Sequence, residues 1–186
     1  MKKTSITGLI IIPLLLSIAI LSSCSREKDG IEPGDNVYGF ILGEKKGDLF
    51  NRAKGQINIT RLKKNKRSDD PRSDMWIASA ALSNSSGVEN VRLTFFEDRL
   101  MEVIVYFKDT SVKKLNQLKK KLEDTYNTTP KSPDGTTETV FKTYRFETPG
   151  TSITLRRITK IGKTELYIQY LHKKLHRKFL ASVRKD

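Results

Sequence analysis

The chain has 186 residues and a formal net charge of +14 at pH 7, from 35 Lys and Arg against 21 Asp and Glu. This length supports one domain, or two small repeated lobes, with an adequate core, and it excludes a second large domain. In a cytosolic chain such a basic balance would make nucleic acid the first candidate partner.

The N-terminus has the pattern of an export signal. Two lysines follow Met1, and an apolar run interrupted by a proline and a serine occupies residues 6–21. This run is too short and too interrupted for a comfortable membrane span, so residues 1–23 are predicted to be a secretory signal peptide. The alternative is an uncleaved signal anchor that ends in an incidental cysteine.

The end of this segment, Leu21-Ser22-Ser23-Cys24, resembles the lipobox of bacterial lipoproteins. The resemblance implies cleavage between Ser23 and Cys24, diacylglycerol (with palmitate among its chains) on the Cys24 thiol, and usually a further acyl chain on the new amine. Several chains would anchor the protein stably, because each buried CH₂ contributes about 0.8 kcal/mol. Ser25 is not Asp, which by the same resemblance favours the outer membrane of a didermal bacterium, facing the periplasm or the cell surface.

Export changes the expected partners and the expected source of stability. Without residues 1–23 the charge balance is 33 basic minus 21 acidic residues, or +12. Outside the cytoplasm nucleic acid is an unlikely partner, and anionic lipids or envelope polymers take its place; the alternative is that the charge serves general solubility. Cys24 is the only cysteine, so no intramolecular disulfide can form and core burial must hold the fold.

A polar segment separates the signal from the first predicted elements. Residues 24–36 contain one large apolar side chain, Ile31, and are predicted to form a lipidated flexible tether. Apolar residues at helical spacing predict a short helix over residues 44–53. Around this helix we expect strands at residues 37–42, 56–61 and 75–82, the last one buried, an exposed loop at residues 63–72 and a turn at residues 83–87.

Strict alternation of apolar and polar residues predicts a β-hairpin next. Val91, Leu93 and Phe95 form the inward face of its first strand, and Glu97-Asp98-Arg99 supplies the tight connection. The inward residues of the second strand are Met101, Val103, Val105 and Phe107.

An amphipathic helix is predicted over residues 112–126. Asp109-Thr110-Ser111 offers N-cap side chains before it, and an apolar stripe follows at three- and four-residue steps. The lysines around the stripe are predicted to be its solvated face, and the alternative is an anion-facing patch. The stripe consists of Val112, Leu115, Leu118, Leu122 and Tyr126.

The remainder of the chain predicts three more strands and a terminal helix. The strands are expected at residues 139–146, 152–159 and 165–171, after a loop at 127–137 and with turns at 147–150 and 161–163. A helix is expected over residues 172–185. The whole pattern predicts an α+β domain over residues 37–171, with helices on one face of an antiparallel sheet and possibly two repeated helix-plus-sheet units, followed by a basic helix or tail at 172–186.

A second resemblance rests on punctuation motifs rather than on chemistry. The segments 39–43, 96–100, 122–130 and 167–170 are similar to those of a loose group of uncharacterised exported bacterial proteins. Asn127 stands where that group usually has glycine, and Phe146 where it usually has tryptophan. The resemblance implies no catalytic residues.

Several chemistries lack their residues in this sequence. Nucleophilic catalysis needs Ser, Cys or Thr beside a base, yet the only cysteine is assigned to lipid and both histidines lie in the terminal segment. His172 and His176 could hold zinc or copper from one helix face, but lysines and arginines surround them, so we expect two solvent-exposed histidines and no metal site. Glu97, Asp98 and Glu102 lack the ligand spacing of a calcium loop.

Aromatic residues could line a ligand groove, but alternation favours core or sheet-surface packing for most of them. There is no Gly-rich phosphate loop, and no cofactor is expected. The aromatic candidates are Trp76, Tyr106, Tyr144, Phe146, Tyr167 and Tyr170.

These observations predict a non-enzymatic envelope lipoprotein, a binding or assembly module that meets an unidentified envelope protein at the membrane surface. The alternative is a small envelope hydrolase or metal-dependent enzyme with an unrecognised site. The terminal helix has two readings of its own: its apolar stripe packs on the sheet, which we prefer, or the helix seeks an anionic surface. Its anion-contacting residues would be Lys173, Lys174, Arg177 and Lys178.

Overall fold

In the computed structural model the chain falls into two units, Met1–Gly30 and Ile31–Asp186, and the description is confined to the second. The predicted signal peptide, Cys24 and most of the predicted tether lie outside the described part. Within that part, no helix is both long enough and apolar enough to cross a membrane. The described residues are 34–62, 72–81, 86–131 and 141–184.

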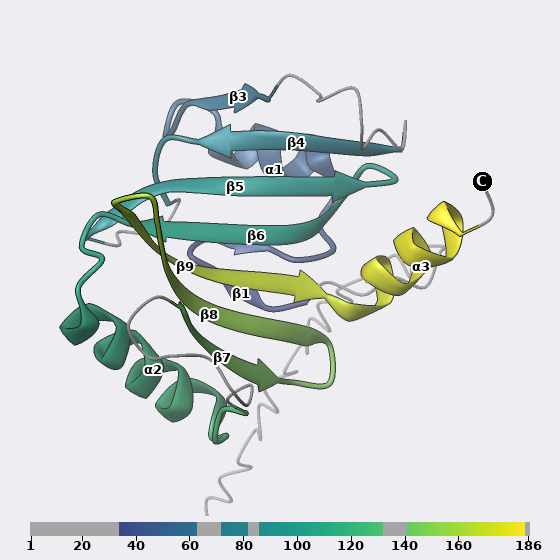
Figure 1. Ribbon diagram of the computed structural model, residues 1–186. Helices are drawn as coiled ribbons and strands as arrows, with labels where there is room; N and C mark the ends of the chain where they lie inside the picture. The colour runs from purple at the N-terminus through teal and green to yellow at the C-terminus, as the bar shows by residue number, and fades with distance from the viewer. Residues whose placement is uncertain (1–33, 63–71, 82–85, 132–140, 185–186) are drawn as a thin grey trace, which may run out of the picture. The chain divides into compact units, whose positions relative to one another are not determined.

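A seven-stranded antiparallel sheet forms the framework of the described residues, in the order β3-β4-β5-β6-β9-β8-β7 (Figure 1). A small second sheet pairs β1 with β2. The predicted α+β class is confirmed, whereas a repeat of two units is not. The strands are β1 Asn36–Val37, β2 Phe40–Ile41, β3 Ile59–Arg61, β4 Ser73–Ala78, β5 Val88–Phe96, β6 Arg99–Phe107, β7 Phe141–Glu147, β8 Thr151–Lys160 and β9 Lys163–His172; the helices are α1 Lys46–Ala53, α2 Val112–Tyr126 and α3 Lys173–Val183.

Helices α1 and α2 cover the same face of this sheet and share one hydrophobic core with it. From α1, Leu49 is buried, and Phe50 packs edge-to-face on Trp76 and Phe95 with ring centroids 4.8 and 5.9 Å apart. The predicted stripe of α2 is confirmed where Leu115, Leu118 and Leu122 enter the core. Each such burial removes apolar area from water and stabilises the fold by about 1.5–3 kcal/mol.

The predicted central hairpin is confirmed as β5 and β6, with Glu97 and Asp98 at its tip. Both tip residues have positive φ, as a two-residue hairpin turn requires. The helix that follows begins as predicted, because the Ser111 hydroxyl accepts a hydrogen bond from the Lys114 N–H at 3.1 Å. It ends at Asn127, whose left-handed conformation is the one a C-cap glycine would adopt.

The strand predicted at residues 37–42 is wrong: the chain reverses there to form β1 and β2. Tyr38 and Gly39 both have positive φ, at 52° and 89°, and Asn36 Oδ1 accepts a hydrogen bond from the Gly39 N–H. The predicted tether is also too long, because Gly34 donates to the Leu42 carbonyl and Asn36 already lies in β1. Alternation alone could not show this turn, since Tyr38 is not a typical turn residue.

Helix α3 corrects the expectation that all helices lie on one face. Its Leu175 forms a separate cluster with Phe96 and Met101, outside the core that α1 and α2 share. A register shift between β5 and β6 beside Phe95 leaves Met101 without a paired residue. Met101 therefore does not face inward with Val103 and Val105, as had been predicted, but joins the cluster under α3. Phe179 then packs edge-to-face on Phe96, with ring centroids 5.4 Å apart. The preferred reading of the terminal helix, with its stripe on its own sheet, is therefore confirmed for these residues.

Two strands differ from their predicted bounds. Strand β3 covers only Ile59–Arg61, and β4 runs over Ser73–Ala78 instead of 75–82. Five of the six residues of β4 are half-buried, so the expectation of a buried strand is wrong. Both strands lie toward one edge of the sheet, where fewer neighbours cover them.

The turn between β8 and β9 holds a poorly suited residue. Ile161 has a φ of +47° and a fully exposed side chain, and a β-branched residue is strained in this left-handed conformation.

Ile161→Asn should therefore raise the Tm by about 2–4 °C, because asparagine tolerates that backbone and no packing is lost. Thermal unfolding measures the change. Ile161→Val keeps the β-branch and should give no gain; an equal gain in both variants would contradict the strain argument.

Candidate functional site

Three tyrosines gather around a pocket of about 200 Å³ between β1, β9 and the C-terminal half of α2. Tyr38 comes from the β1–β2 turn, Tyr126 from the last turn of α2, and Tyr170 from β9. We call these three residues the tyrosine pocket. The other lining residues are Asn36, Val37, Leu118, Lys121, Leu122, Thr125 and Ile168.

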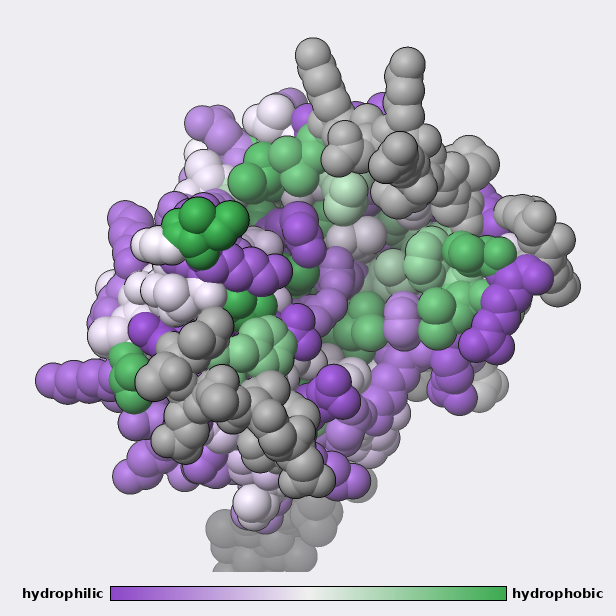
Figure 2. Space-filling model, viewed as in Figure 1, coloured by the Kyte–Doolittle hydropathy of each residue, from purple (hydrophilic) through white to green (hydrophobic). Residues whose placement is uncertain are grey.

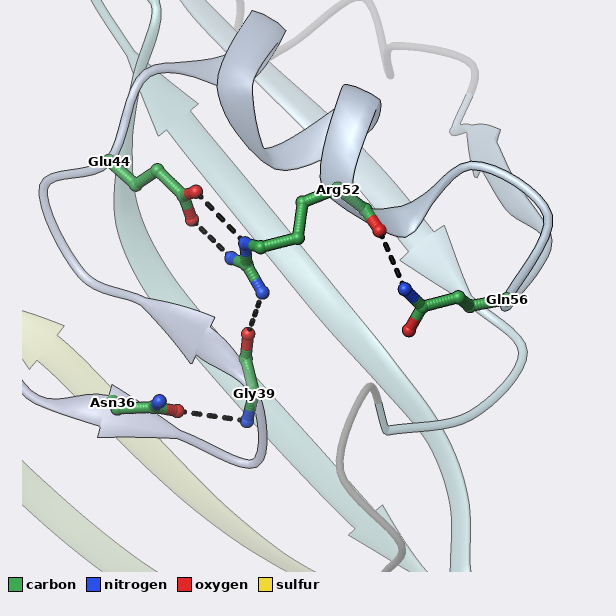
Figure 3. Close-up of polar contacts among 5 residues, drawn as sticks. All are labelled: Asn36, Gly39, Glu44, Arg52 and Gln56. Atoms are coloured by element: carbon green, nitrogen blue, oxygen red, sulfur yellow. Dashed lines mark hydrogen bonds and ion pairs between the residues drawn. The ribbon is translucent and has the colours of Figure 1, made fainter.

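Arg52 of α1 fixes the turn that carries Tyr38 (Figure 3). Its guanidinium donates to the Gly39 carbonyl at 2.5 Å and to both carboxylate oxygens of Glu44, at 2.6 and 3.3 Å. The Asn36 side chain holds the Gly39 N–H from the other side. A forked guanidinium suits this task, because one rigid group bonds two partners at once. The Tyr38 ring is thereby held next to Phe107, with ring centroids 6.3 Å apart.

The hydroxyls of the tyrosine pocket stay uncharged at neutral pH. Burial raises the pKa of Tyr38. Burial raises the pKa of Tyr126 to about 12, and the negative charge of Asp35 adds to that shift. Burial also raises the pKa of Tyr170 well above its usual value, with further contributions from the neighbouring tyrosines and Asp35. These groups can therefore bind a ligand, but they are poorly matched to proton transfer near pH 7.

Charges of both signs lie beside the pocket. The Lys121 ammonium lies over the Tyr38 ring, 5.8 Å from its centroid. Within the described part of the chain, the buried Oδ2 of Asp35 has no hydrogen-bond partner. A buried carboxylate oxygen without a donor is unfavourable, so this atom favours a cationic or donor group nearby.

A second pocket, of about 300 Å³, opens on the face of the sheet that α1 and α2 leave uncovered. Its lining includes Arg92, Tyr106 and the ion-paired Lys163 and Glu165, whose charged atoms are 3.1 Å apart. Tyr106 packs on Tyr167 with ring centroids 5.4 Å apart. Burial raises the pKa of Tyr106, although the charge of Arg92 opposes that shift.

This second pocket has no single chemical preference, because its charges of opposite sign lie side by side. Figure 2 is viewed with α1 behind the sheet and shows separate hydrophobic patches with hydrophilic side chains between them. The described residues of this face therefore do not form the contiguous apolar area of an obvious protein interface.

The predicted aromatic candidates divide between core and pockets. Tyr144 and Phe146 are buried core residues, and Trp76 packs on α1. Tyr106 and Tyr167 lie on the uncovered face, and Tyr170 lines the tyrosine pocket. The sequence did not single out Tyr38, because it fell in a predicted strand, or Tyr126, because it completed an apolar helix stripe.

The expectation of two solvent-exposed histidines is wrong. His172 is buried at the start of α3, where its Nδ1 accepts a hydrogen bond from the Leu175 N–H at 3.4 Å. His176 is half-buried and stacks near Phe179, with ring centroids 6.5 Å apart. Among the described residues, no three His, Cys, Asp or Glu side chains converge as a metal site would require.

The acidic residues of the central hairpin have structural partners. Asp98 at the tip forms an ion pair with Lys46 of α1 at 2.9 Å. Glu102 accepts hydrogen bonds from Thr94 and Gln169 across three strands. These contacts fit turn and strand surface.

The four predicted anion-contacting residues all lie on α3, but they differ in their surroundings. Lys173 is half-buried and pairs with Glu147 at 2.5 Å while donating to the Thr148 carbonyl. Lys174, Arg177 and Lys178 are exposed. Ser23 and Cys24 lie outside the described residues.

Comparison with protein-family models, curated proteins and solved structures gave no match to this chain.

Removing the Arg52 clamp should loosen the β1–β2 turn. In Arg52→Ala, amide hydrogen exchange of Gly39 and Phe40 should speed up by about tenfold or more, because the charge-assisted bonds to Gly39 and Glu44 are lost. Arg52→Lys keeps the charge without the fork and should give an intermediate rate. NMR-detected exchange measures these rates. Gln56→Ala removes only the bond to the Arg52 carbonyl and should leave them unchanged; equal rates in wild type and Arg52→Ala would contradict the clamp.

The raised pKa of Tyr126 predicts a stability loss in alkali. Its contribution is fully present below the unfolded pKa, near 10, and is lost as pH rises toward the folded pKa of about 12. The free energy of unfolding should therefore fall over this range by about 1 kcal/mol through Tyr126, less than the full shift would give, because the half-exposed phenol is partly screened by solvent. Urea unfolding from pH 9 to 11.5 should show a shallower decline in Tyr126→Phe. Thr125→Ser, in the same pocket, should keep the wild-type slope; an unchanged slope in Tyr126→Phe would refute this origin.

Proposed function

We propose that this chain is a lipid-anchored lipoprotein of the cell envelope whose α+β domain acts as a non-enzymatic binding module at the membrane surface. The observation that carries the anchor is Leu21-Ser22-Ser23-Cys24 behind an apolar signal core. Nine residues then separate Cys24 from the first described residue, Gly34. This spacing would hold the domain close to the bilayer that receives the acyl chains.

The tyrosine pocket supports binding rather than chemistry. Three tyrosine side chains line one concave space, as in ligand sites, and their hydroxyls are uncharged near pH 7. Their raised pKa values make them weak bases and weak acids near neutrality. We therefore prefer a ligand or assembly role to the alternative of a hydrolase or metal-dependent enzyme.

Helix α3 supports a location near anionic envelope components. Its apolar side packs on Phe96 and Met101, so its exposed basic residues Lys174, Arg177 and Lys178 remain on the outer side. Near an anionic bilayer each such residue adds about 1 kcal/mol of attraction. Lys173 is less suited to this role because Glu147 already pairs with it. Anionic lipids or envelope polymers are thus the proposed general surroundings of the domain.

The anchor is tested by metabolic labelling with a palmitate analogue in a bacterial host. Wild-type protein should be labelled, and Cys24→Ala should not be, because no other thiol exists in the chain. Ser25→Ala is the matched control and should keep the label. In a didermal host, Ser25→Asp should keep the label but move the protein from the outer to the inner membrane fraction. Unlabelled wild type, or equal labelling of Cys24→Ala, would sink the proposal.

A further inference from the structure

We infer that the tyrosine pocket is an aromatic cage for a ligand that carries an alkylammonium group. This inference names the ligand class of the proposed binding module and rests on that proposal. It is carried by three tyrosines that line one pocket, a buried carboxylate oxygen of the adjacent Asp35 and a helix end, all of which favour positive charge there.

The three tyrosine rings make the pocket suited to a cation. Tyr38, Tyr126 and Tyr170 border the same space of about 200 Å³, which has room for an ion with several methyl groups. Aromatic faces attract cations through their quadrupole, and sets of such rings are the usual receptors of quaternary ammonium ions. The chain itself illustrates the preference, because the Lys121 ammonium lies over the face of Tyr38, 5.8 Å from the centroid.

Asp35 supplies a negative charge close to the tyrosine pocket. Within the described part of the chain, its buried Oδ2 lacks a hydrogen-bond partner. Asp35 directly precedes Asn36 and Val37, which line the pocket. Its negative charge contributes to the raised pKa of Tyr126 and of Tyr170. A cation bound among the rings would compensate this carboxylate, whereas an anion would meet it as a like charge.

The C-terminal end of α2 also favours a cation in the tyrosine pocket. This helix has 15 residues and ends at Tyr126, so the negative end of its dipole lies at the pocket. Basic residues commonly neutralise such an end, yet the last turn of α2, all of it described, carries none. The field of the helix therefore adds to that of Asp35 and favours a cation from outside.

Lys121 is the internal competitor for this site. Its residue is exposed, and a lysine side chain is long and flexible, so its ammonium can leave the Tyr38 ring without disturbing the core. An entering ligand must displace it or share the pocket with it. Removing this charge should consequently tighten binding.

The test is an NMR titration of tetramethylammonium chloride with the full chain, kept in a maltoside detergent that has no ammonium group. Stacking over ring faces should shift the methyl resonance upfield, saturably, while sodium chloride at equal ionic strength holds screening constant. Tyr126→Leu keeps an apolar side chain but removes a ring, and should weaken binding by about 2- to 30-fold. Tyr126→Phe keeps the ring and should bind within a factor of about two of wild type.

Three further variants separate the cage from general attraction. Asp35→Asn should weaken binding and Lys121→Met should tighten it. Tyr106→Leu makes the same change on the uncovered face and should leave binding unaltered. Tighter binding of glycerophosphocholine than of choline would assign a lipid headgroup, and the reverse order a soluble amine.

The inference is overturned if wild-type protein gives no saturable shift, if binding is seen only in Lys121→Met, or if Tyr126→Leu and Tyr106→Leu weaken it equally. Circular dichroism of each variant reports folding, and Tyr126→Phe keeps the test valid if Tyr126→Leu unfolds. Acylation of Cys24 plays no part in this titration. A failed titration beside successful palmitate labelling would therefore reject the ligand class while leaving the lipoprotein proposal intact.

Discussion

The pairing of β6 with β9 is the contact on which the rest of the structure depends. It joins Glu102–Tyr106 to Tyr167–Leu171, segments separated by α2, β7 and β8 in the chain, and makes one sheet out of two strand groups. Only this continuous sheet gives α1 and α2 a common face and a common core. Closing so long a segment is costly in chain entropy, and the burial of Val103, Val105 and Ile168 offsets it.

The register of the neighbouring pair, β5 with β6, explains why the two faces differ. On one side, alternating apolar residues meet α1 and α2; on the other, the register shift near Phe95 adds Met101 to a smaller cluster that only α3 covers. Among the described residues, polar contacts rather than a helix lie over the middle of that second face. Glu102 accepts hydrogen bonds from Thr94 and Gln169 on neighbouring strands, so three strands are cross-linked there.

Periodicity predicted the elements with strong patterns, and missed those set by single residues or by distant partners. The hairpin of β5 and β6, helix α2 and the last strands followed from alternation, helical spacing and capping. The reversal at Tyr38-Gly39 did not, because Arg52 and Asn36 hold a turn that Tyr38 does not favour by itself. The side of the sheet that α3 covers depends on a bulge, and a pattern within one strand cannot show a bulge. The tyrosine pocket was hidden for a similar reason: its three rings come from a turn, a helix end and a strand, and only the fold brings them together.

A cation site in so basic a chain requires that near charges outweigh distant ones. Screening in physiological salt acts over about 8 Å, so most of the 35 lysines and arginines have little effect inside the tyrosine pocket. What acts there lies close by: the three tyrosine rings, the neighbouring Asp35 and the end of α2 favour a cation, and Lys121 opposes it. Partial burial weakens the screening of these local terms, and the opposing Lys121 is exposed and flexible enough to move away. The net charge would then act at longer range, drawing the domain toward an anionic surface, while the pocket selects a group of the opposite sign.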